Sequence, residues 1–154
     1  MSVIVFHQGK LYADVLLNGY YVAMNAYGWY FWLYGGSRTS KDTLAISSTP
    51  RRIGGSLLVL TILGTLLMGF LFDNNTDASL PYWDSLTTCM SFAAMWMTAR
   101  KYIENWAVWL IVDLLSVGIY LIKGIELYAI LYGLYLIMAI VGWSRWKKIA
   151  ATQQ

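Results

Sequence analysis

Long runs of apolar residues alternate with short polar segments along this 154-residue chain. A helix needs about 20 residues to cross the roughly 30 Å hydrocarbon core of a bilayer. By this measure, the pattern predicts membrane-spanning helices at residues 11–34, 53–72, 81–98, 105–122 and 127–146. The apolar run at residues 1–6 is too short to span a membrane, and we interpret it as the end of a helix whose beginning is missing. The chain is therefore predicted to be an all-α integral membrane protein with five full spans and an N-terminal helix remnant.

The composition supports this interpretation and disfavours several classes of function. Hydrophobic residues make up 58% of the chain and charged residues 12%, whereas soluble domains carry about 25% charged residues. The single cysteine, Cys89, excludes an internal disulfide and a thiolate metal site, and the single histidine, His7, excludes a histidine cluster. Neither a catalytic Ser-His-Asp set nor a glycine-rich phosphate loop is recognisable. We therefore predict no enzyme activity, no metal and no cofactor.

Basic residues gather in alternate connections between the predicted spans. Residues 35–52 contain four, residues 100–104 contain two, and a further group lies at residues 145–148, whereas residues 73–80 contain none. Because positive charge favours the cytoplasmic side, residues 35–52, residues 100–104 and the C-terminus are predicted to be cytoplasmic. The net charge of +3 is small, and the basic residues lie in the connections. This pattern indicates orientation in a membrane rather than nucleic-acid binding.

The fourth predicted span carries an acidic residue, Asp113, near its middle. At 100° per residue, one stripe about 80° wide is aromatic and polar, while the opposite face is aliphatic. The stripe contains Trp106, Trp109, Asp113, Ser116 and Tyr120. A carboxylate at the centre of a bilayer costs roughly 2.5–3.5 kcal/mol. A bound polar or cationic solute is one candidate to offset this cost, and a partner on another helix is the alternative.

The first and fifth spans align without gaps at an offset of 114 residues and share the pattern G-W-x-x-W. The shared pattern comprises Gly28, Trp29 and Trp32 in the first span and Gly142, Trp143 and Trp146 in the fifth. Four crossings separate the two copies, so they run in the same direction. Parallel repeats with a substrate site between them are a known transporter plan. The alternative is that Gly-Trp pairs are simply common at membrane boundaries.

Polar and aromatic stripes also mark the first, third and fifth spans, whereas residues 53–72 carry only three hydroxyls and are interpreted as a lipid-facing linker. The third span places Asp84, Thr87, Thr88, Ser91, Met95 and Thr98 on one side. Aromatic faces suit a flat solute and attract cations. We therefore expect a small aromatic ligand, uncharged or cationic, with polar appendages. The predicted binding residues are Trp109, Asp113, Trp106, Asn105, Asn18, Asn25, Trp29, Asp84, Thr88, Tyr128 and Tyr132.

Structural roles are open for several of these residues. The tryptophans fit an interfacial belt, and Asp84 fits the positive end of a helix dipole. Asn18 and Asn25 fit interhelical hydrogen bonds. Arg100 and Glu104 are interpreted as solvated loop residues.

Two segments resemble the PnuC family of bacterial nicotinamide riboside transporters. One runs from Trp83-Asp84-Ser85 to Thr98-Ala99-Arg100-Lys101-Tyr102-Ile103-Glu104-Asn105-Trp106, with Trp109 and Asp113 after it. The other comprises Leu11-Tyr12-Ala13 and the run from Asn25 to Trp32. The resemblance implies seven spans in two three-helix bundles joined by a linking helix, as in SWEET sugar transporters.

On this plan, residues 1–35 form part of the first bundle and residues 36–52 a cytoplasmic loop. Residues 53–72 form the linking helix, residues 81–146 the complete second bundle, and residues 147–154 a cytoplasmic tail. The first family helix and most of the second are expected to be missing.

The resemblance also implies a function. Family members are multi-pass inner-membrane facilitators that work by alternating access; a cytosolic kinase then traps the vitamin for NAD biosynthesis. They form homotrimers in the lipid bilayer. Trp109 matches the residue that stacks on nicotinamide and Asn25 matches a family asparagine. Asp113 stands where asparagine is usual, and Asn18 where glutamine is common. These departures leave thiamine or a related B vitamin as an alternative substrate, and a truncated, non-transporting or structural membrane subunit as an alternative function.

Overall fold

The computed structural model describes residues 19–34, 45–75 and 79–152. Residues 19–34 are helical, and four further helices follow. They are α2 (Arg51–Asn75), α3 (Pro81–Ala99), α4 (Asn105–Ile122) and α5 (Glu126–Thr152). Across these described ranges the only β-type pairing is an isolated bridge between Ser47 and Tyr102. The prediction of an all-α chain is therefore confirmed. Residues 1–18, which include the helix remnant and Asn18, lie outside the described residues.

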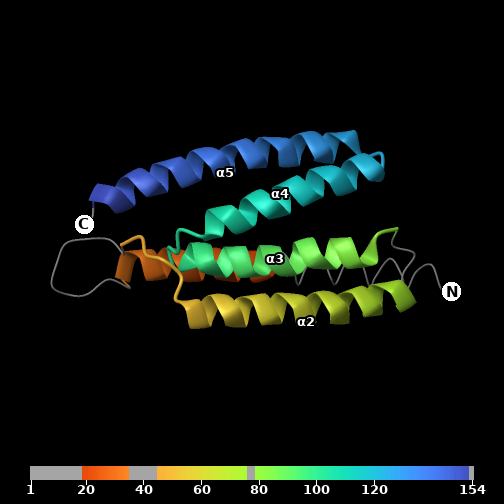
Figure 1. Ribbon diagram of the computed structural model, residues 1–154, viewed down its shortest axis with the longest axis horizontal. Coiled ribbons are helices and arrows are strands. Elements are labelled where there is room, and N and C mark those ends of the chain that lie inside the picture. Colours follow the sequence, from red (N-terminus) through yellow and green to blue (C-terminus); the bar gives the residue numbers. More distant parts are fainter. Residues whose placement is uncertain (1–18, 35–44, 76–78, 153–154) are drawn as a thin grey trace.

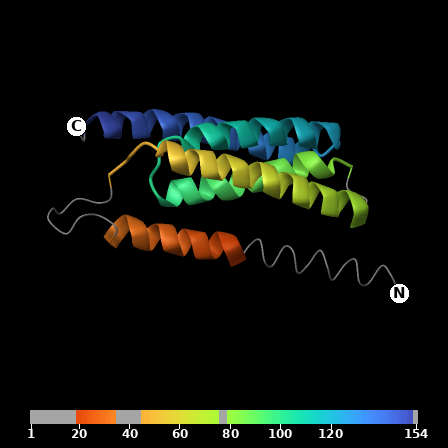
Figure 2. The ribbon, with the colours of Figure 1, turned by 60° about the horizontal axis from the view of Figure 1, so that its bottom comes forward.

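The helices pack in an order that brings segments distant in the sequence together. α3 packs against both α2 and α4, and α4 packs against α5 (Figure 1). Helix 19–34 lies along α3, on a different side from α2 (Figure 2). Tyr20 donates a hydrogen bond to the Phe92 carbonyl of α3, at 3.3 Å. α3 is therefore the central helix, with helix 19–34, α2 and α4 around it.

α2 is apolar on all sides, and among its residues only Gly69 is buried. Its leucines and Phe70 are largely exposed, as expected for a helix that faces lipid. Its contact with α3 depends on a close approach, because Gly69 lies against the ring of Tyr82. Within the described residues, α2, α4 and α5 are long and apolar enough to cross a membrane.

α3 contains more serine and threonine residues than α2, α4 or α5, and several of their hydroxyl groups bond within the helix. Ser85, Thr88 and Ser91 each donate a hydrogen bond to the carbonyl four residues earlier, at 2.7 or 2.8 Å. Such bonds satisfy the hydroxyl group without a partner on another helix. A helix with many hydroxyls can therefore lie at the centre of the bundle.

The connection between α3 and α4, residues 100–104, is bonded to the segment that precedes α2. Ser47 donates its N–H to the Lys101 carbonyl at 3.1 Å and accepts from the Ile103 N–H at 3.0 Å. A carboxylate oxygen of Glu104 accepts hydrogen bonds from both the N–H and the hydroxyl of Thr49, each at 2.8 Å. The loop thereby fixes the start of α2 relative to the central helices.

This arrangement corrects the interpretation of Arg100 and Glu104 as solvated loop residues. Glu104 is bonded to Thr49, and the Arg100 guanidinium lies over the rings of Phe31, at 4.6 Å, and Trp96, at 5.4 Å. Sequence spacing could not reveal these contacts because the Glu104 partner lies 55 residues away. Both residues join separate helices at one end of the bundle.

The predicted helix boundaries agree with those of α3 and α4 to within one residue, whereas α2 and α5 are longer than predicted. α2 was predicted at residues 53–72 and extends from Arg51 to Asn75. The predicted start of the first span, at residue 11, lies outside the described residues. α4 has the predicted bounds, and α5 was predicted to end at residue 146 but continues to Thr152. Residues 147–152 contain neither glycine nor proline, and their lysines and alanines favour a helix. Only the helix boundary is corrected here. The cytoplasmic position of residues 147–154 stays a prediction.

Candidate functional site

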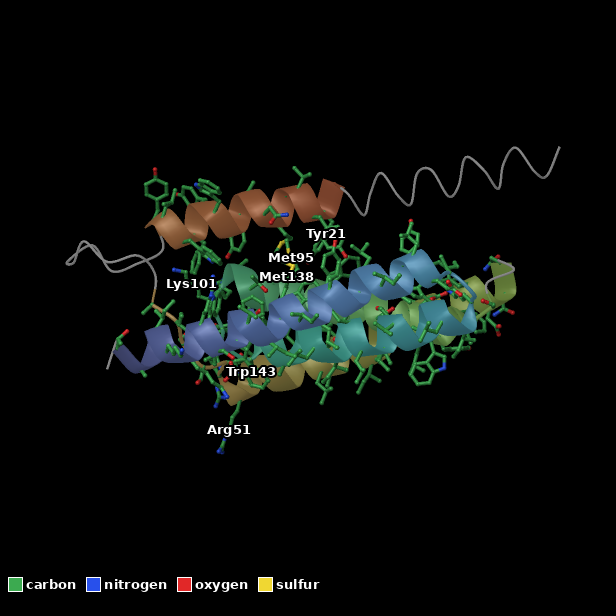
Figure 3. All side chains as sticks on the ribbon, turned by 90° about the horizontal axis from the view of Figure 1, so that it is seen from above. Tyr21, Arg51, Met95, Lys101, Met138 and Trp143 are labelled. Carbon is green, nitrogen blue, oxygen red and sulfur yellow. The ribbon has the colours of Figure 1, made fainter. Side chains whose placement is uncertain are left out.

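A cavity of about 250 Å³ lies between helix 19–34, α3, α4 and α5. We call it the central cavity. In Figure 3, Tyr21 and Met138 lie in the space between helix 19–34 and the helices below it. The lining residues are Tyr21, Ser91, Trp106, Trp109, Val112, Asp113, Tyr132, Tyr135, Met138 and Ala139. The wall is thus rich in aromatic rings, and Asp113 is its acidic group.

Asp113 lies in the third turn of α4 and is only 3% exposed. None of the residues that the structure describes forms a hydrogen bond or ion pair with its carboxylate. Ser91, Tyr21 and Tyr132 line the same cavity. Asp113 lies four residues after Trp109 in the stripe on α4, so both side chains lie on the same side of this helix.

Trp109 lines the cavity one turn before Asp113, and its ring is held by a hydrogen bond to α3. The indole Nε1 donates a hydrogen bond to the Thr98 hydroxyl at 3.2 Å. That hydroxyl also lies 3.1 Å from Oδ1 of Asn105 and 2.8 Å from the Ala94 carbonyl. The hydrogen bond fixes the indole plane and leaves its face available for stacking.

Asn105 was predicted to bind substrate, but it does not line the central cavity. It is fully buried, and its amide nitrogen donates to the Tyr102 carbonyl at 2.6 Å. Its amide oxygen faces Thr98. The structure therefore places Asn105 behind Trp109, where it orients Thr98.

A second, more polar cavity of about 320 Å³ adjoins the first, and we call it the polar pocket. The two share Tyr21, Ser91, Val112 and Tyr132. Its distinctive feature is an ion pair between Lys123 and Asp84, with N–O distances of 2.7 and 2.8 Å. The other lining residues are Thr87, Thr88, Ser116, Ile119 and Tyr120.

Stacked tyrosines form one side of this pocket. Tyr120 stacks on Tyr132 with ring centroids 5.3 Å apart and on Tyr128 at 5.1 Å. Tyr132 lines both cavities, whereas Tyr128 lines neither and is 48% exposed. The predicted Tyr128 position therefore supports the ring stack from outside.

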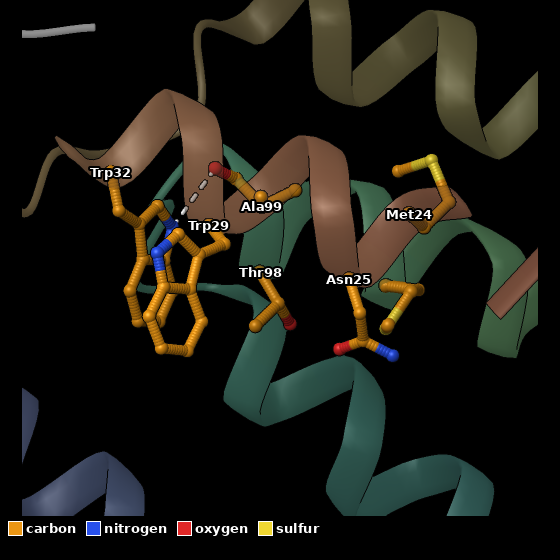
Figure 4. A pocket seen from close by; sticks show the side chains of 8 residues that line it. Met24, Asn25, Trp29, Trp32, Thr98 and Ala99 are labelled. Carbon is orange, nitrogen blue, oxygen red and sulfur yellow. Dashed lines mark hydrogen bonds between the residues drawn. The ribbon is translucent and has the colours of Figure 1, made fainter. Parts of the chain in front are cut away.

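A third pocket, of about 170 Å³, lies between helix 19–34 and the end of α3 (Figure 4). It contains the predicted residues Asn25 and Trp29. The Asn25 amide donates to the Tyr21 carbonyl of its own helix at 2.8 Å, and Trp29 is 73% exposed. Trp32 also lines this pocket and donates a 3.0 Å hydrogen bond to the Ala99 carbonyl.

The polar stripe of α3 runs past all three cavities. Asp84, Thr87, Thr88 and Ser91 line the polar pocket, Ser91 also lines the central cavity, and Met95 and Thr98 line the third pocket. Of the predicted binding residues, Trp106, Trp109, Asp113 and Tyr132 meet at the central cavity, while Asp84 and Thr88 lie in the polar pocket. Asn18 lies outside the described residues.

Sequence reasoning missed Tyr21, Ser91, Tyr135 and Lys123 as members of these sites. Tyr21, Ser91 and Tyr135 belong to stripes that the pattern does identify, so helical spacing was a sufficient signal for them. Lys123 gave no such signal, because it follows an apolar helix and its partner Asp84 is 39 residues away. Within the described ranges, no group of three or more His, Cys, Asp or Glu residues is placed to hold a metal ion.

Comparison with known proteins identifies the family. Residues 1–148 match the family described as nicotinamide mononucleotide transporter. The nicotinamide riboside transporter PnuC of Escherichia coli is 30% identical over 93% of this chain and 70% of its own length. The riboflavin/roseoflavin transporter RibM of Streptomyces davaonensis is 25% identical over 81% of this chain and 59% of its own.

A crystal structure of the vitamin B3 transporter PnuC supports the fold independently of sequence identity. It superposes with a TM-score of 0.68 at 21% identity, covering 94% of this chain and 66% of that one. The family and this structural neighbour are transporters rather than enzymes. The chain therefore belongs to the PnuC family of vitamin transporters and is a multi-pass membrane protein.

Proposed function

We propose that this protein is a facilitator for nicotinamide riboside. The observation that carries the proposal is the pairing of Trp109 and Asp113 on one wall of the central cavity, one helical turn apart. Nicotinamide riboside joins a flat, positively charged pyridinium ring to a ribose. A tryptophan face attracts such a ring, and a buried carboxylate complements its charge or binds its hydroxyl groups.

We assign roles to the residues around the cavities from their positions. Trp109 stacks on the pyridinium ring, while Trp106 and Tyr132 complete the aromatic wall of the central cavity. Ser91 and the tyrosine hydroxyls are placed to bind the amide or the ribose. Asp84 and Thr88 contact the solute as it passes the polar pocket, and Asn25 and Trp29 contact it at the third pocket.

The charge of the cavity favours a nucleoside over a nucleotide. Among its described lining residues, the central cavity contains one carboxylate and no basic side chain. The nearest cation in the adjoining pocket, Lys123, is bonded to Asp84. A phosphate group beside Asp113 would meet repulsion without a compensating cation.

Thiamine is a second candidate because of the departure at position 113. The resemblance to nicotinamide riboside carriers implies asparagine at this position, whereas this chain has Asp113. Thiamine is also a flat aromatic cation, so a carboxylate there suits either vitamin. The similarity to RibM, whose name assigns it riboflavin and roseoflavin, supports a family whose members differ in the vitamin they carry.

Transport would proceed by alternating access between the two parallel repeat units, with phosphorylation by a cytosolic kinase retaining the vitamin. Arg51, Arg100 and Arg145 lie in segments that meet at one end of the bundle, because Ser47 pairs with Tyr102 and Trp32 contacts Trp146. This clustering supports a cytoplasmic location for that end and for the C-terminus, in a bacterial inner membrane. Assembly as a homotrimer is proposed from the family resemblance.

Titration of the purified chain with nicotinamide riboside and thiamine tests the proposal. We expect binding of at least one, and uptake of the same vitamin into proteoliposomes along its gradient without ATP. Asp113→Leu should weaken binding roughly 10- to 100-fold, because a hydrogen bond to a charged group is lost. Asp113→Asn is the matched control and should retain nicotinamide riboside. Failure of the wild-type chain to bind either vitamin would overturn the proposal.

A further inference from the structure

Gly142 of α5 lies directly against the indole of Trp106 on α4. A Cβ atom built on Gly142 would lie 2.7 Å from Cζ2 of Trp106 and still closer to Cη2 and Cζ3. Real Cβ atoms essentially never approach other heavy atoms within 3.0 Å. The benzene part of this indole therefore occupies the space that a side chain at position 142 would fill.

Trp106 is held on a second side by another tryptophan. The rings of Trp106 and Trp146 meet edge to face, with centroids 5.4 Å apart and an interplanar angle of 88°. Gly142 and Trp146 lie one turn apart on α5, so a single stretch of this helix supports the ring. The position of Trp106 is thus set by α5 rather than by its own helix.

Trp106 lines the central cavity together with Trp109 and Asp113, but its indole N–H does not face it. The indole Nε1 is buried and has no hydrogen-bond partner among the described residues. A solute in the cavity therefore meets the ring surface of Trp106 rather than its N–H group.

We infer that Gly142 is a positioning residue that seats Trp106 in the wall of the central cavity, where its ring packs against the transported solute. The inference deepens the proposed function and rests on it for the identity of the solute. Alanine at position 142 would push the ring away from α5, because the ring is more easily moved than either helix backbone.

The chain provides a matched control on the same helix. Gly133 also lies in α5, but nothing lies within 4 Å of a Cβ atom at that position. Gly142→Ala and Gly133→Ala therefore make the same chemical change and raise helix propensity equally. Only the first should displace Trp106.

Two measurements test the inference. In protein labelled with ¹⁵N-tryptophan, the Trp106 indole N–H signal is assigned through Trp106→Phe. We expect Gly142→Ala to shift this signal in the ligand-free protein and to weaken binding of nicotinamide riboside or thiamine by roughly tenfold, the scale of one lost aromatic contact. Gly133→Ala should leave both unchanged. The same vitamin should shift the Trp106 signal when it binds to the wild-type protein.

A double variant separates a role through Trp106 from a general effect of the substitution. In the Trp106→Phe background, Gly142→Ala should cause no further loss of affinity. An equal loss in both backgrounds, or an unmoved Trp106 signal in Gly142→Ala, would overturn the inference. If the wild-type chain binds neither vitamin, the proposed function fails and the contact of the Trp106 ring with the solute fails with it. The ligand-free signal then decides the seating of Trp106 by Gly142 on its own.

Discussion

Trp32 and Trp146 meet edge to face, with ring centroids 6.1 Å apart and an interplanar angle of 61°. They occupy equivalent positions in the two G-W-x-x-W copies, 114 residues apart. The equivalent glycines also face the same region, since Gly28 lies against Ala99 at the end of α3 and Gly142 against Trp106 at the start of α4. The two copies therefore converge on the α3–α4 connection from opposite sides.

The first prediction concerns the stability that this convergence provides. Trp146→Leu removes edge-to-face contacts with both Trp32 and Trp106. Each such contact contributes about 0.5–1.5 kcal/mol, so we expect a loss of roughly 1–3 kcal/mol, seen as a lower melting temperature in detergent. Trp143→Leu is the control, because the described contact of Trp143 is with Lys147 on the same helix. Equal destabilisation by both variants would contradict a special role for Trp146.

The second prediction concerns the support of Trp109. Thr98→Val keeps the shape of the side chain but removes the hydroxyl that accepts the Trp109 N–H. The ring should lose its fixed orientation, and vitamin affinity should fall roughly 5- to 10-fold, the value of a single hydrogen bond. Titration of purified protein measures the effect.

Thr87→Val is the matched control for this experiment. The Thr87 hydroxyl donates only to carbonyls of its own helix, those of Trp83 and Asp84. It lines the polar pocket rather than the central cavity. Thr87→Val should therefore retain affinity, and a loss equal to that of Thr98→Val would argue against orientation of Trp109 as the cause.

The sequence predicted the elements of this fold better than the contacts between them. α4 has the predicted bounds because Asn105 begins a predominantly apolar run that ends before Lys123 and Gly124. The stripe on α3 could be predicted because a helix places every third or fourth residue on one face. These are local properties, and a periodic pattern specifies them.

Contacts that depend on packing could not be predicted in the same way. Asn105 has a side chain of the type expected in a binding site, yet its amide is bonded to Thr98 and Tyr102. Lys123 resembled an isolated loop charge until its helix was placed beside Asp84. In each case the decisive partner lies on a turn or helix whose position the pattern does not specify.

The third prediction concerns the ion pair in the polar pocket. Both side chains are only partly exposed, at 21% for Lys123 and 33% for Asp84. Partial exposure limits the coupling, which we expect to be about 1 kcal/mol. A double-mutant cycle of Lys123→Met and Asp84→Asn, read by melting temperature, measures it. Additive effects of the two substitutions would mean that the pair contributes no coupling.

The last prediction concerns pH and Glu104. Burial raises the pKa of this carboxyl group, but hydrogen bonds from the Thr49 N–H and hydroxyl, the Glu104 backbone and the Ser48 side chain together outweigh it, so the pKa lies below its ordinary value. Because the folded-state pKa is the lower one, its contribution to stability is present above the ordinary glutamate pKa of about 4.3. It is lost as the pH falls through the folded-state value.

We therefore expect the wild-type melting temperature to fall more steeply below about pH 4.3 than that of Glu104→Gln, which cannot titrate. At neutral pH the variant should be less stable by about 1–2 kcal/mol, the scale of a charge-assisted hydrogen bond. Thr49→Val removes one of the donors to Glu104 and keeps the Thr49 backbone N–H. It should lie between the wild type and Glu104→Gln at neutral pH and keep part of the acid dependence. Parallel melting curves for all three proteins would show that Glu104 does not hold the α3–α4 connection to the start of α2 in its ionised form.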